Sequence, residues 1–254
     1  MANKNKIILI TGASRGIGAA TAILAARQGY DVVINYAGNL DAAKTVGDAI
    51  NQLGRKALLI QADVSCEEDV IRMFDETAQT FGGVDALVNN AGILENQMPV
   101  EQMSLARLQR VMAVNVIGSF LCAREAIKYM AIKHGGNGGN GGAIVNVSSA
   151  AARLGSPFEF VDYAASKGAI DSMTIGLAKE IASDGIRVNA VRPGLIYTDI
   201  HQLAGEPGRV DRLKDAVPMK RGGTADEVAQ TIIWLLSDAA SYVSGSILDV
   251  AGGR

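Results

Sequence analysis

The sequence predicts a single α/β domain in which helices cover both faces of a parallel, doubly wound sheet of about seven strands. Short β-rich runs alternate with longer amphipathic segments along all 254 residues. Hydrophobic residues make up 48% of the chain but aromatic residues only 5%, so small aliphatic side chains must fill the core, which suits a sheet covered on both faces. Neither a linker nor an internal repeat is visible, and one domain over residues 1–254 is expected.

The predicted elements follow one another in regular order. Strands are expected at residues 7–11, 31–36, 56–62, 86–89, 143–147, 187–191 and 246–250. Helices are expected at residues 17–27, 40–53, 67–80, 105–133, 163–181 and 225–236. A Gly/Asn-rich run at 135–142 predicts a surface loop. The irregular stretch 195–223 contains glycines and prolines and is long enough to form a lid over a pocket.

Charge and composition argue against several function classes. The chain has 24 basic and 26 acidic residues and no basic block, so neither a nucleic-acid nor a membrane partner is expected. The N-terminal apolar run is too short to span a membrane, and no signal peptide is predicted. Cys66 and Cys122 lack CxxC spacing, which favours a reducing cytoplasm over a disulfide or zinc framework. His134 and His201 stand alone, so no metal site is predicted and both are interpreted as surface or loop residues.

A glycine-rich turn directly after the first predicted strand carries the first functional signal. Its glycines are spaced G-x-x-x-G-x-G and lead into an alanine-rich helix. Glycine lets the backbone approach a pyrophosphate, and the free N–H groups at a helix start favour negative charge. In this strand–turn–helix context a dinucleotide site is predicted rather than an ordinary turn. The cofactor contacts expected here are Gly12, Ser14, Arg15, Gly16, Ile17 and Gly18.

The end of the second strand bears on which dinucleotide is bound. An NAD site usually places a carboxylate here to bond the ribose 2′-hydroxyl, but the chain has Asn35, Tyr36 and Ala37. Arg15 in the glycine turn would meet a 2′-phosphate, and the neutral Asn35 would tolerate it. NADP(H) is therefore predicted as the preferred cofactor, with NAD(H) as the alternative. The competing interpretation of Arg15 is a solvated loop residue.

Polar residues also follow the third and fourth predicted strands. Ligands of open α/β sheets bind beyond the carboxyl ends of the strands, so segments 63–64 and 89–92 face the expected crevice. Asp63 is predicted to accept a hydrogen bond from an adenine amino group, and capping of the next helix beside Ser65 is the alternative. The cofactor contacts expected from these segments are Asp63, Val64, Asn89, Ala91 and Gly92.

A tyrosine and a lysine four residues apart, Tyr163 and Lys167, carry the predicted chemistry. On a helix this spacing places both side chains on one face. A free tyrosine has a pKa of about 10 and is a poor base at neutral pH, and a nearby positive charge lowers that value. The pair predicts a proton donor and acceptor near the dinucleotide, which is what hydride transfer needs.

Six motifs together carry a resemblance to a known family. They are the segments 11–18 and 89–92, Asn115, Ser148 with Ser149, residues 163–167, and Pro193 with Gly194, in this order along nearly the whole chain. In these motifs the chain resembles the short-chain dehydrogenase/reductase family. The resemblance implies a Rossmann-type domain and an enzyme that interconverts a carbonyl and a secondary alcohol with a nicotinamide cofactor.

The same resemblance implies roles for individual residues. Tyr163 would be the general acid in reduction and the base in oxidation, and Lys167 would lower its pKa and bond the nicotinamide ribose. Ser149 would polarise the substrate carbonyl. Its gap to Tyr163 is one residue longer than usual but nearer to the family spacing than that of Ser148, the alternative. Asn115 would hold a water that links Lys167 to solvent. The family pattern also implies that the nicotinamide carboxamide is held by Pro193, Gly194, Ile196 and Thr198.

The sequence is less informative about the substrate, a small-molecule carbonyl or alcohol. Position alone predicts a pocket lined by Leu94, Ser149, Ala151, Glu159, Phe160 and Leu195. Glu159 would bond a polyhydroxylated ligand, so a sugar or polyol dehydrogenase is one alternative. A reductase of 3-oxoacyl groups on a carrier protein is another, although Asp184 stands where those reductases resemble one another in carrying arginine. A non-catalytic NADP-binding redox sensor is a third alternative.

The resemblance further implies a homo-oligomer, either a tetramer or a dimer. The helices expected at 105–133 and 163–181 have apolar faces suited to contacts between subunits, and residues 249–254 would join a second interface. The alternative is that these apolar faces cover only the sheet of their own chain.

Overall fold

The computed structural model describes residues 5–136 and 141–254, and its centre is a parallel sheet with the strand order β3-β2-β1-β4-β5-β6-β7. The chain builds outward from β1 to β3 and then crosses back to place β4 on the other side of β1. The crevice at this switch point is where such sheets bind ligands. The predicted doubly wound sheet is confirmed. Its strands are β1 Ile7–Ile10, β2 Asp31–Tyr36, β3 Ala57–Gln61, β4 Ala86–Asn89, β5 Gly142–Val147, β6 Ile186–Pro193 and β7 Ile247–Val250.

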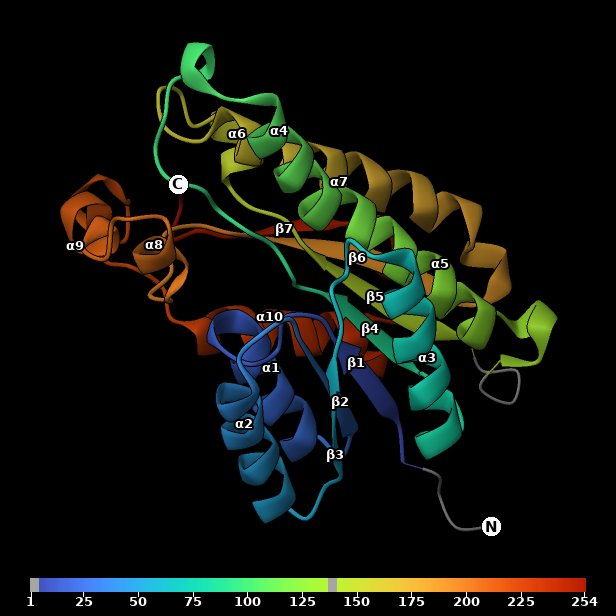
Figure 1. Ribbon diagram of the computed structural model, residues 1–254. Coiled ribbons are helices and arrows are strands. Elements are labelled where there is room, and N and C mark those ends of the chain that lie inside the picture. The colour runs from blue at the N-terminus through green and yellow to red at the C-terminus, as the bar shows by residue number, and fades with distance from the viewer. Residues whose placement is uncertain (1–4, 137–140) are drawn as a thin grey trace.

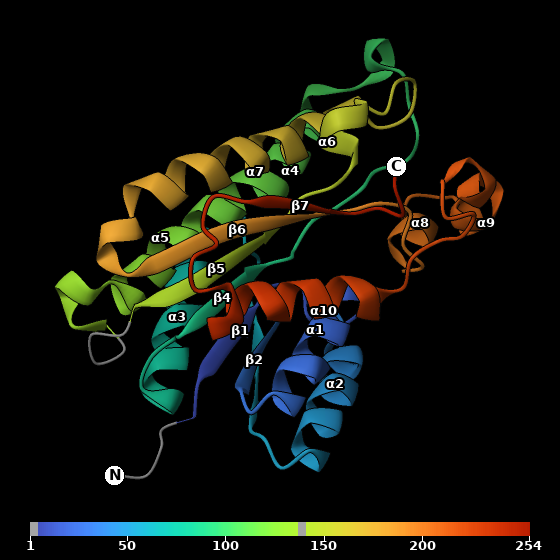
Figure 2. The same cartoon turned by 180° about the vertical axis from the view of Figure 1, so that it is seen from behind.

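Helices cover both faces of the sheet (Figure 1). On one face lie α1 Gly16–Arg27, α2 Leu40–Gln52 and α10 Ala225–Leu236. On the other lie α3 Glu67–Phe81, α5 Gly118–Met130 and α7 Val161–Glu180, with α4 Leu105–Met112 leading into α5. The view from behind shows α10 beside α1 across the sheet from α7 (Figure 2). Three short helices, α6 Ala151–Leu154, α8 Ile200–Leu203 and α9 Arg209–Leu213, lie at the end of the molecule where the strands finish.

The prediction of one regular helix over residues 105–133 is wrong. The chain forms a π-helical turn over Ala113–Ile117 between α4 and α5, and α5 ends at Met130. Within the described residues, Leu105–Met130 is the one helix long and apolar enough to cross a membrane by length and composition alone. Its side chains Cys122, Ala126 and Met130 are buried in the core beneath the sheet.

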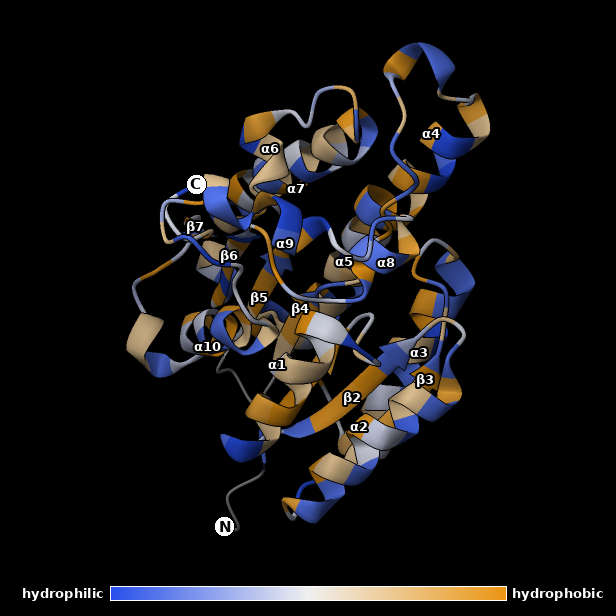
Figure 3. Ribbon diagram, turned by 90° about the vertical axis from the view of Figure 1, so that its left-hand side faces the viewer, coloured by the Kyte–Doolittle hydropathy of each residue, from blue (hydrophilic) through white to orange (hydrophobic). Residues whose placement is uncertain are grey.

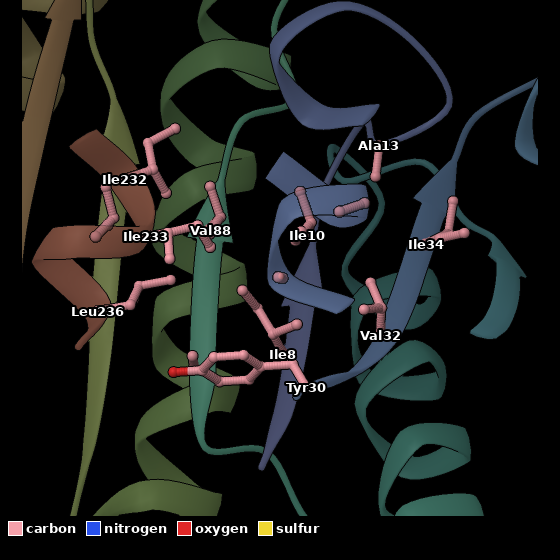
Figure 4. Packing of buried hydrophobic residues seen from close by; sticks show 14 of the residues in the cluster. Ile8, Ile10, Ala13, Tyr30, Val32, Ile34, Val88, Ile232, Ile233 and Leu236 are labelled. Atoms are coloured by element: carbon pink, nitrogen blue, oxygen red, sulfur yellow. The ribbon is translucent and has the colours of Figure 1, made fainter. Parts of the chain in front are cut away.

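Two apolar clusters, one on each face, hold the layers together. Successive residues of a strand point to opposite faces, so Ile8 and Ile10 of β1 pack toward α10 while Leu9 packs toward α3 and α5. Figure 4 shows Val88 of β4 between Ile10 of β1 and Ile232 of α10 in the first cluster. Burying a side chain of this size contributes about 1.5–3 kcal/mol. In Figure 3 strand β2 is mostly hydrophobic while α2 alternates, as expected for a sheet buried on both faces.

The Gly/Asn-rich run predicted as a loop follows α5. Its residues 137–140 lie outside the described residues. The remaining glycines flank this gap, and Gly142 already belongs to β5.

Candidate active site

The glycine turn between β1 and α1 is shaped by close backbone contacts. Gly12 has a φ of +61°, and a Cβ added there would lie 3.0 Å from the Cα of Ala91. A Cβ added at Gly18 would lie 2.6 Å from the carbonyl oxygen of Gly12. The Asn90 side chain donates hydrogen bonds to the carbonyl oxygens of Thr11 and Gly12, at 2.8 and 3.1 Å. The turn is therefore packed against the segment after β4, and glycine is the residue that fits at both positions.

The start of α1 provides a site for an anion. Arg15 at its N-cap makes no side-chain capping hydrogen bond, and the first turn has no acidic residue. The first N–H groups of a helix lack partners within it and form the positive end of its dipole. These groups and the tight glycine turn fit the pyrophosphate of a dinucleotide.

A cleft of about 1010 Å³ runs from this turn along the carboxyl ends of the strands to α8 and α9. Most of the predicted site residues line it. They are Gly12, Ser14, Arg15, Gly16, Ile17, Asn35, Tyr36, Asp63, Val64, Ala91, Gly92, Ser149, Tyr163, Lys167, Pro193, Gly194, Ile196 and Thr198. The predicted pocket residues Leu94, Ala151, Glu159, Phe160 and Leu195 also line it. Three predicted site residues do not line the cleft: Gly18, Asn89 and Asn115.

Asn89 does not take the place predicted for it beside the cofactor. Its side chain is buried within the sheet and donates hydrogen bonds to the carbonyl oxygen of Ser119, at 3.2 Å, and to Oδ1 of Asn146, at 2.9 Å. Because successive strand residues face opposite ways, the neighbouring Asn90 reaches the glycine turn instead. The sequence analysis missed Asn90, although it stands next to the predicted residue.

Asn35 lines the cleft, but its side chain is committed to the backbone. Oδ1 accepts a hydrogen bond from the Gly12 N–H at 3.1 Å, and Nδ2 donates to the carbonyl oxygen of Ala62 at 3.0 Å. This buried amide joins the glycine turn to the segment after β3. Its role is to fix the shape of the turn rather than to receive a 2′-phosphate.

Asp63 forms a local turn ahead of α3. Its Oδ1 accepts hydrogen bonds from the N–H of Ser65 at 2.9 Å and from the Ser65 hydroxyl at 2.7 Å. The N-cap of α3 is Cys66, which makes no side-chain capping hydrogen bond, so the capping alternative is wrong in detail. Since Asp63 also lines the cleft, its contact with adenine stays a prediction.

Tyr163 and Lys167 face the cleft from the first two turns of α7. The ammonium nitrogen of Lys167 lies 5.6 Å from the centre of the Tyr163 ring and donates to the carbonyl oxygen of Val147 at 2.7 Å. The Ser149 side chain lies close enough to Tyr163 to lower the pKa of its phenol. Ser148 is instead buried and donates from its hydroxyl to the carbonyl oxygen of Lys167 at 3.2 Å. Of the two serines, Ser149 is the one whose side chain meets Tyr163.

Burial controls the ionisation of this pair. It raises the pKa of Tyr163 to about 12, and the nearby Ser149 side chain offsets only part of that rise. It lowers the pKa of Lys167 to about 8, with the carboxylate of Asp171 acting in the opposite direction. The expectation that Lys167 brings the Tyr163 pKa below its ordinary value is therefore wrong for the chain by itself, because desolvation of the phenolate is the dominant effect. At neutral pH Tyr163 carries its proton.

Asn115 connects two segments of the chain through hydrogen bonds of its side chain. It is fully buried in the π-helical turn, where its Oδ1 accepts from the Ile93 N–H at 2.8 Å. Its Nδ2 donates to the Ile93 carbonyl oxygen at 3.0 Å and to the Ser166 hydroxyl at 3.1 Å. Both side-chain groups thus have partners within the protein, and the water implied at Asn115 stays a prediction. It joins the segment after β4 to the helix that carries Tyr163 and Lys167.

The stretch predicted as a lid is tied to the pocket by an arginine. Arg209 of α9 is buried and binds both carboxylate oxygens of Glu159, and it donates to Glu206 at 2.8 Å. The Arg209 guanidinium also lies 5.0 Å from the centre of the Phe160 ring. The carboxylate of Glu159, expected to bond a polyhydroxylated ligand, is thus paired with an arginine. The sugar or polyol alternative loses the residue that suggested it.

His201 of α8 was interpreted as a surface or loop residue, and this is wrong. It lines the cleft, and its Nδ1 is buried and has no hydrogen-bond partner among the described residues. Burial lowers its pKa, so the ring is neutral at pH 7. Only its position in the lid, three residues after Thr198, could have pointed to it. Other cleft residues that the sequence analysis missed are Asn90, Arg110, Arg209 and Arg254.

Comparisons with known proteins agree with this geometry. A family model described as Enoyl-(Acyl carrier protein) reductase matches residues 12–254. The chain is 60% identical over 248 residues to the Uncharacterized oxidoreductase YgfF of Escherichia coli K12, covering 98% of this chain and 99% of that protein.

Two solved structures extend the comparison. A short chain dehydrogenase from Burkholderia cenocepacia in complex with NADP has a TM-score of 0.89 and 33% identity, covering 99% of both chains. A 3-ketoacyl-(acyl-carrier-protein) reductase from Brucella melitensis complexed with NADH has a TM-score of 0.89 and 35% identity, covering 98% of both chains. A nicotinamide cofactor therefore suits this cleft, and the chain, an oxidoreductase with a Rossmann-type sheet, belongs to the short-chain dehydrogenase/reductase family.

Proposed function

We propose that this enzyme interconverts a ketone and a secondary alcohol with NADP(H), using Tyr163 as the general acid and base. The observation that carries the proposal is that Ser149, Tyr163 and Lys167 line one cleft, with the Lys167 ammonium 5.6 Å from the centre of the Tyr163 ring. When bound, the nicotinamide supplies or accepts the hydride. Pro193, Gly194, Ile196 and Thr198 line the part of the cleft where we place that ring.

The side chains then act on the carbonyl oxygen. The hydroxyls of Ser149 and Tyr163 donate hydrogen bonds to it, where negative charge develops during reduction. Tyr163 gives up its proton in reduction and takes one back in oxidation. Its high pKa keeps the proton in place at neutral pH, and the buried ammonium of Lys167 stabilises the phenolate that remains.

Preference for NADP(H) rests on charge at the cofactor end. Strand β2 ends at Tyr36 and is followed by Ala37, so no carboxylate stands there to repel a 2′-phosphate. Arg15 lines the cleft at the exposed start of α1 and is the cation we assign to that phosphate. The Burkholderia structure holds NADP and the Brucella structure NADH, so NAD(H) stays the alternative.

We further propose that the substrate is uncharged and largely apolar. Leu94, Leu154, Leu195 and Leu203 line the cleft, and its buried arginine is neutralised by glutamates. The Brucella relative acts as a 3-ketoacyl-(acyl-carrier-protein) reductase, which makes a carrier-linked 3-oxoacyl group the second candidate. Asp184, the acidic residue that argues against an acyl-carrier-protein partner, forms an ion pair with Lys133 at 2.6 Å.

Residues 195–223 are proposed as the lid over this substrate. Its buried Arg209 bridges Glu159, which stands beside the start of α7, and Glu206, within the lid itself. The ion pair to Glu159 is the contact that would hold the lid closed.

A homotetramer is proposed as the working form. Ile117 of the π-helical turn and Phe120 of α5 are 51% and 52% exposed, and Ile175 of α7 is also exposed. Trp234 of α10 offers a second exposed apolar surface. We also propose a cytoplasmic location, because the thiols of Cys66 and Cys122 are free.

The test is turnover by the purified protein of three substrate groups: apolar ketones, sugars with polyols, and 3-oxoacyl thioesters. NADPH oxidation is followed with the carbonyl compounds and NADP+ reduction with the polyols. Turnover of the apolar ketones is expected to exceed that of the other two groups. Preference for the thioester of an acyl carrier protein would support the second candidate instead. Absence of turnover with every group would contradict the proposed function.

A further inference from the structure

A buried ion pair stands immediately before Tyr163, and none of the roles above uses it. Arg107 of α4 donates from Nε to Oδ2 of Asp162 at 2.7 Å and from Nη2 to Oδ1 at 3.2 Å. Their side chains are only 9% and 1% exposed. A two-pronged contact between arginine and carboxylate fixes orientation as well as distance.

The same arginine holds the segment that follows β4. Its Nη1 donates to the Asn96 carbonyl oxygen at 2.6 Å and lies 3.8 Å from the sulfur of Met98. The Met98 N–H in turn donates to the Glu159 carbonyl oxygen at 3.0 Å. Arg107 therefore connects α4, this segment and the entry to α7 in one cluster.

The start of α7 lacks the local features that usually fix a helix end. Its N-cap, Phe160, makes no side-chain capping hydrogen bond. The loop before it contains two non-glycine residues with positive φ, Ser156 at +44° and Phe158 at +64°. With neither a cap nor a relaxed entry loop, the first turn takes its position from tertiary contacts. Asp162, in that turn, makes the two-pronged ion pair with Arg107.

We propose that Arg107 and Asp162 form a positioning pair that aims the Tyr163 hydroxyl at the Ser149 hydroxyl. The inference rests on the proposed function. Neither residue of the pair lines the cleft, so neither touches the reacting atoms. Tyr163 follows Asp162 directly, and neighbouring helix residues point about 100° apart. A shift or rotation of the first turn therefore moves the phenol relative to Ser149 and the carbonyl it must reach.

Removing one partner alone is a poor test, because it strands a buried charge and destabilises the fold. Replacing both partners by apolar residues of similar size usually preserves stability, so the variant to make is Arg107→Met with Asp162→Leu. Its melting temperature and NADPH affinity are expected to stay near those of the parent. Its kcat is expected to fall about 100-fold, the effect of a displacement of about 1 Å.

The pH dependence separates positioning from general stability. A phenol moved from its place also moves relative to the Lys167 ammonium, which lies 5.6 Å from the centre of its ring. The fall in kcat as Lys167 loses its charge near pH 8 should therefore become shallower in the double variant. A pair that only stabilises the fold would leave that fall unchanged.

The matched control breaks another arginine–aspartate pair far from the cleft. Arg55 is 18% exposed in its side chain and contacts Asp31 at 2.8 Å, where β2 begins. The Arg55→Met, Asp31→Asn variant should keep the kcat and pH profile of the parent. A second variant, Asp162→Glu, keeps the charge but lengthens the side chain, and its kcat should fall about tenfold by misplacing the helix start.

Retention of kcat within twofold by the folded double variant would overturn the inference. If the double variant does not fold, unchanged kcat and pH profile in Asp162→Glu would overturn it equally. Failure of the proposed function has a different signature: Tyr163→Phe would then keep full turnover, whatever the Arg107 and Asp162 variants do.

Discussion

The two ends of the cleft are built by different means. At the cofactor end the backbone supplies the site, through the glycine turn, the start of α1 and the ends of the strands. At the substrate end, side chains from separate elements are joined by ion pairs, as between Glu159 and Arg209 or Asp162 and Arg107. The first arrangement suits a ligand shared by many enzymes. The second can vary without disturbing it, which is how one fold comes to serve many substrates.

The largest effect is expected at the substrate end, from Tyr163→Phe. Loss of the proton donor should lower kcat about 1000-fold, within the range of general acid–base catalysis. NADPH affinity, measured by fluorescence titration, should stay within a few-fold, because the ring is retained. A comparable loss of NADPH binding would instead place Tyr163 mainly at the cofactor end.

The pH dependence of reduction gives the next effect. Tyr163, with its pKa raised to about 12, keeps its proton through the neutral range, while Lys167, with its pKa lowered to about 8, does not keep its charge above that pH. The reductive kcat should therefore be level at neutral pH and fall as pH rises through about 8, since the phenolate then forms without a neighbouring cation. A kcat that rises through this range would contradict the role of Lys167.

Gly12→Ala should test the backbone character of the cofactor end. The added Cβ meets Ala91 at 3.0 Å at a position with φ of +61°, and NADPH affinity should fall about tenfold as the turn shifts. Gly54→Ala is the control, because Gly54 has a φ of +74° but no atoms near the added Cβ. Both variants should lose stability by about 1 kcal/mol, and only Gly12→Ala should lose NADPH affinity.

The smallest effect is expected from Arg15→Gln. The side chain is exposed, so its ion pair with a 2′-phosphate is worth about 1 kcal/mol, or several-fold in affinity. NADPH should bind more weakly by that factor while NADH affinity stays unchanged, as measured by titration with each cofactor. Equal weakening of both would assign Arg15 to the pyrophosphate or to the turn itself.

Most residues predicted for the cofactor end line one cleft, because local patterns determine their positions. The glycine spacing, the strand ends and the Tyr163–Lys167 pair all depend on residues close together in the chain, and the structure brings them to one cleft. The wrong predictions at the cofactor end concern the directions in which single side chains point. Asn89 and Asn35 turn into the sheet, and only the register of the strands decides that.

The substrate end was harder to predict because its contacts join distant parts of the chain. Glu159 and Arg209 are 50 residues apart in the sequence, and Arg107 and Asp162 are 55 apart. No sequence pattern with such a long separation identifies two residues as an ion pair. The π-helical turn at Asn115 was likewise invisible, since the surrounding pattern is that of an ordinary helix. Pairing of this kind is a property of the folded chain.

The buried amide of Asn35 has a practical consequence for redesign of coenzyme choice. Introducing an aspartate at that position, an obvious step toward NADH, would replace an amide that donates to the Ala62 carbonyl with a group that can only accept. Two oxygens would then oppose each other inside the sheet, and the polypeptide would lose rigidity where the coenzyme docks. Engineers should begin at Ala37 instead, just beyond β2, where a new carboxylate would reach solvent.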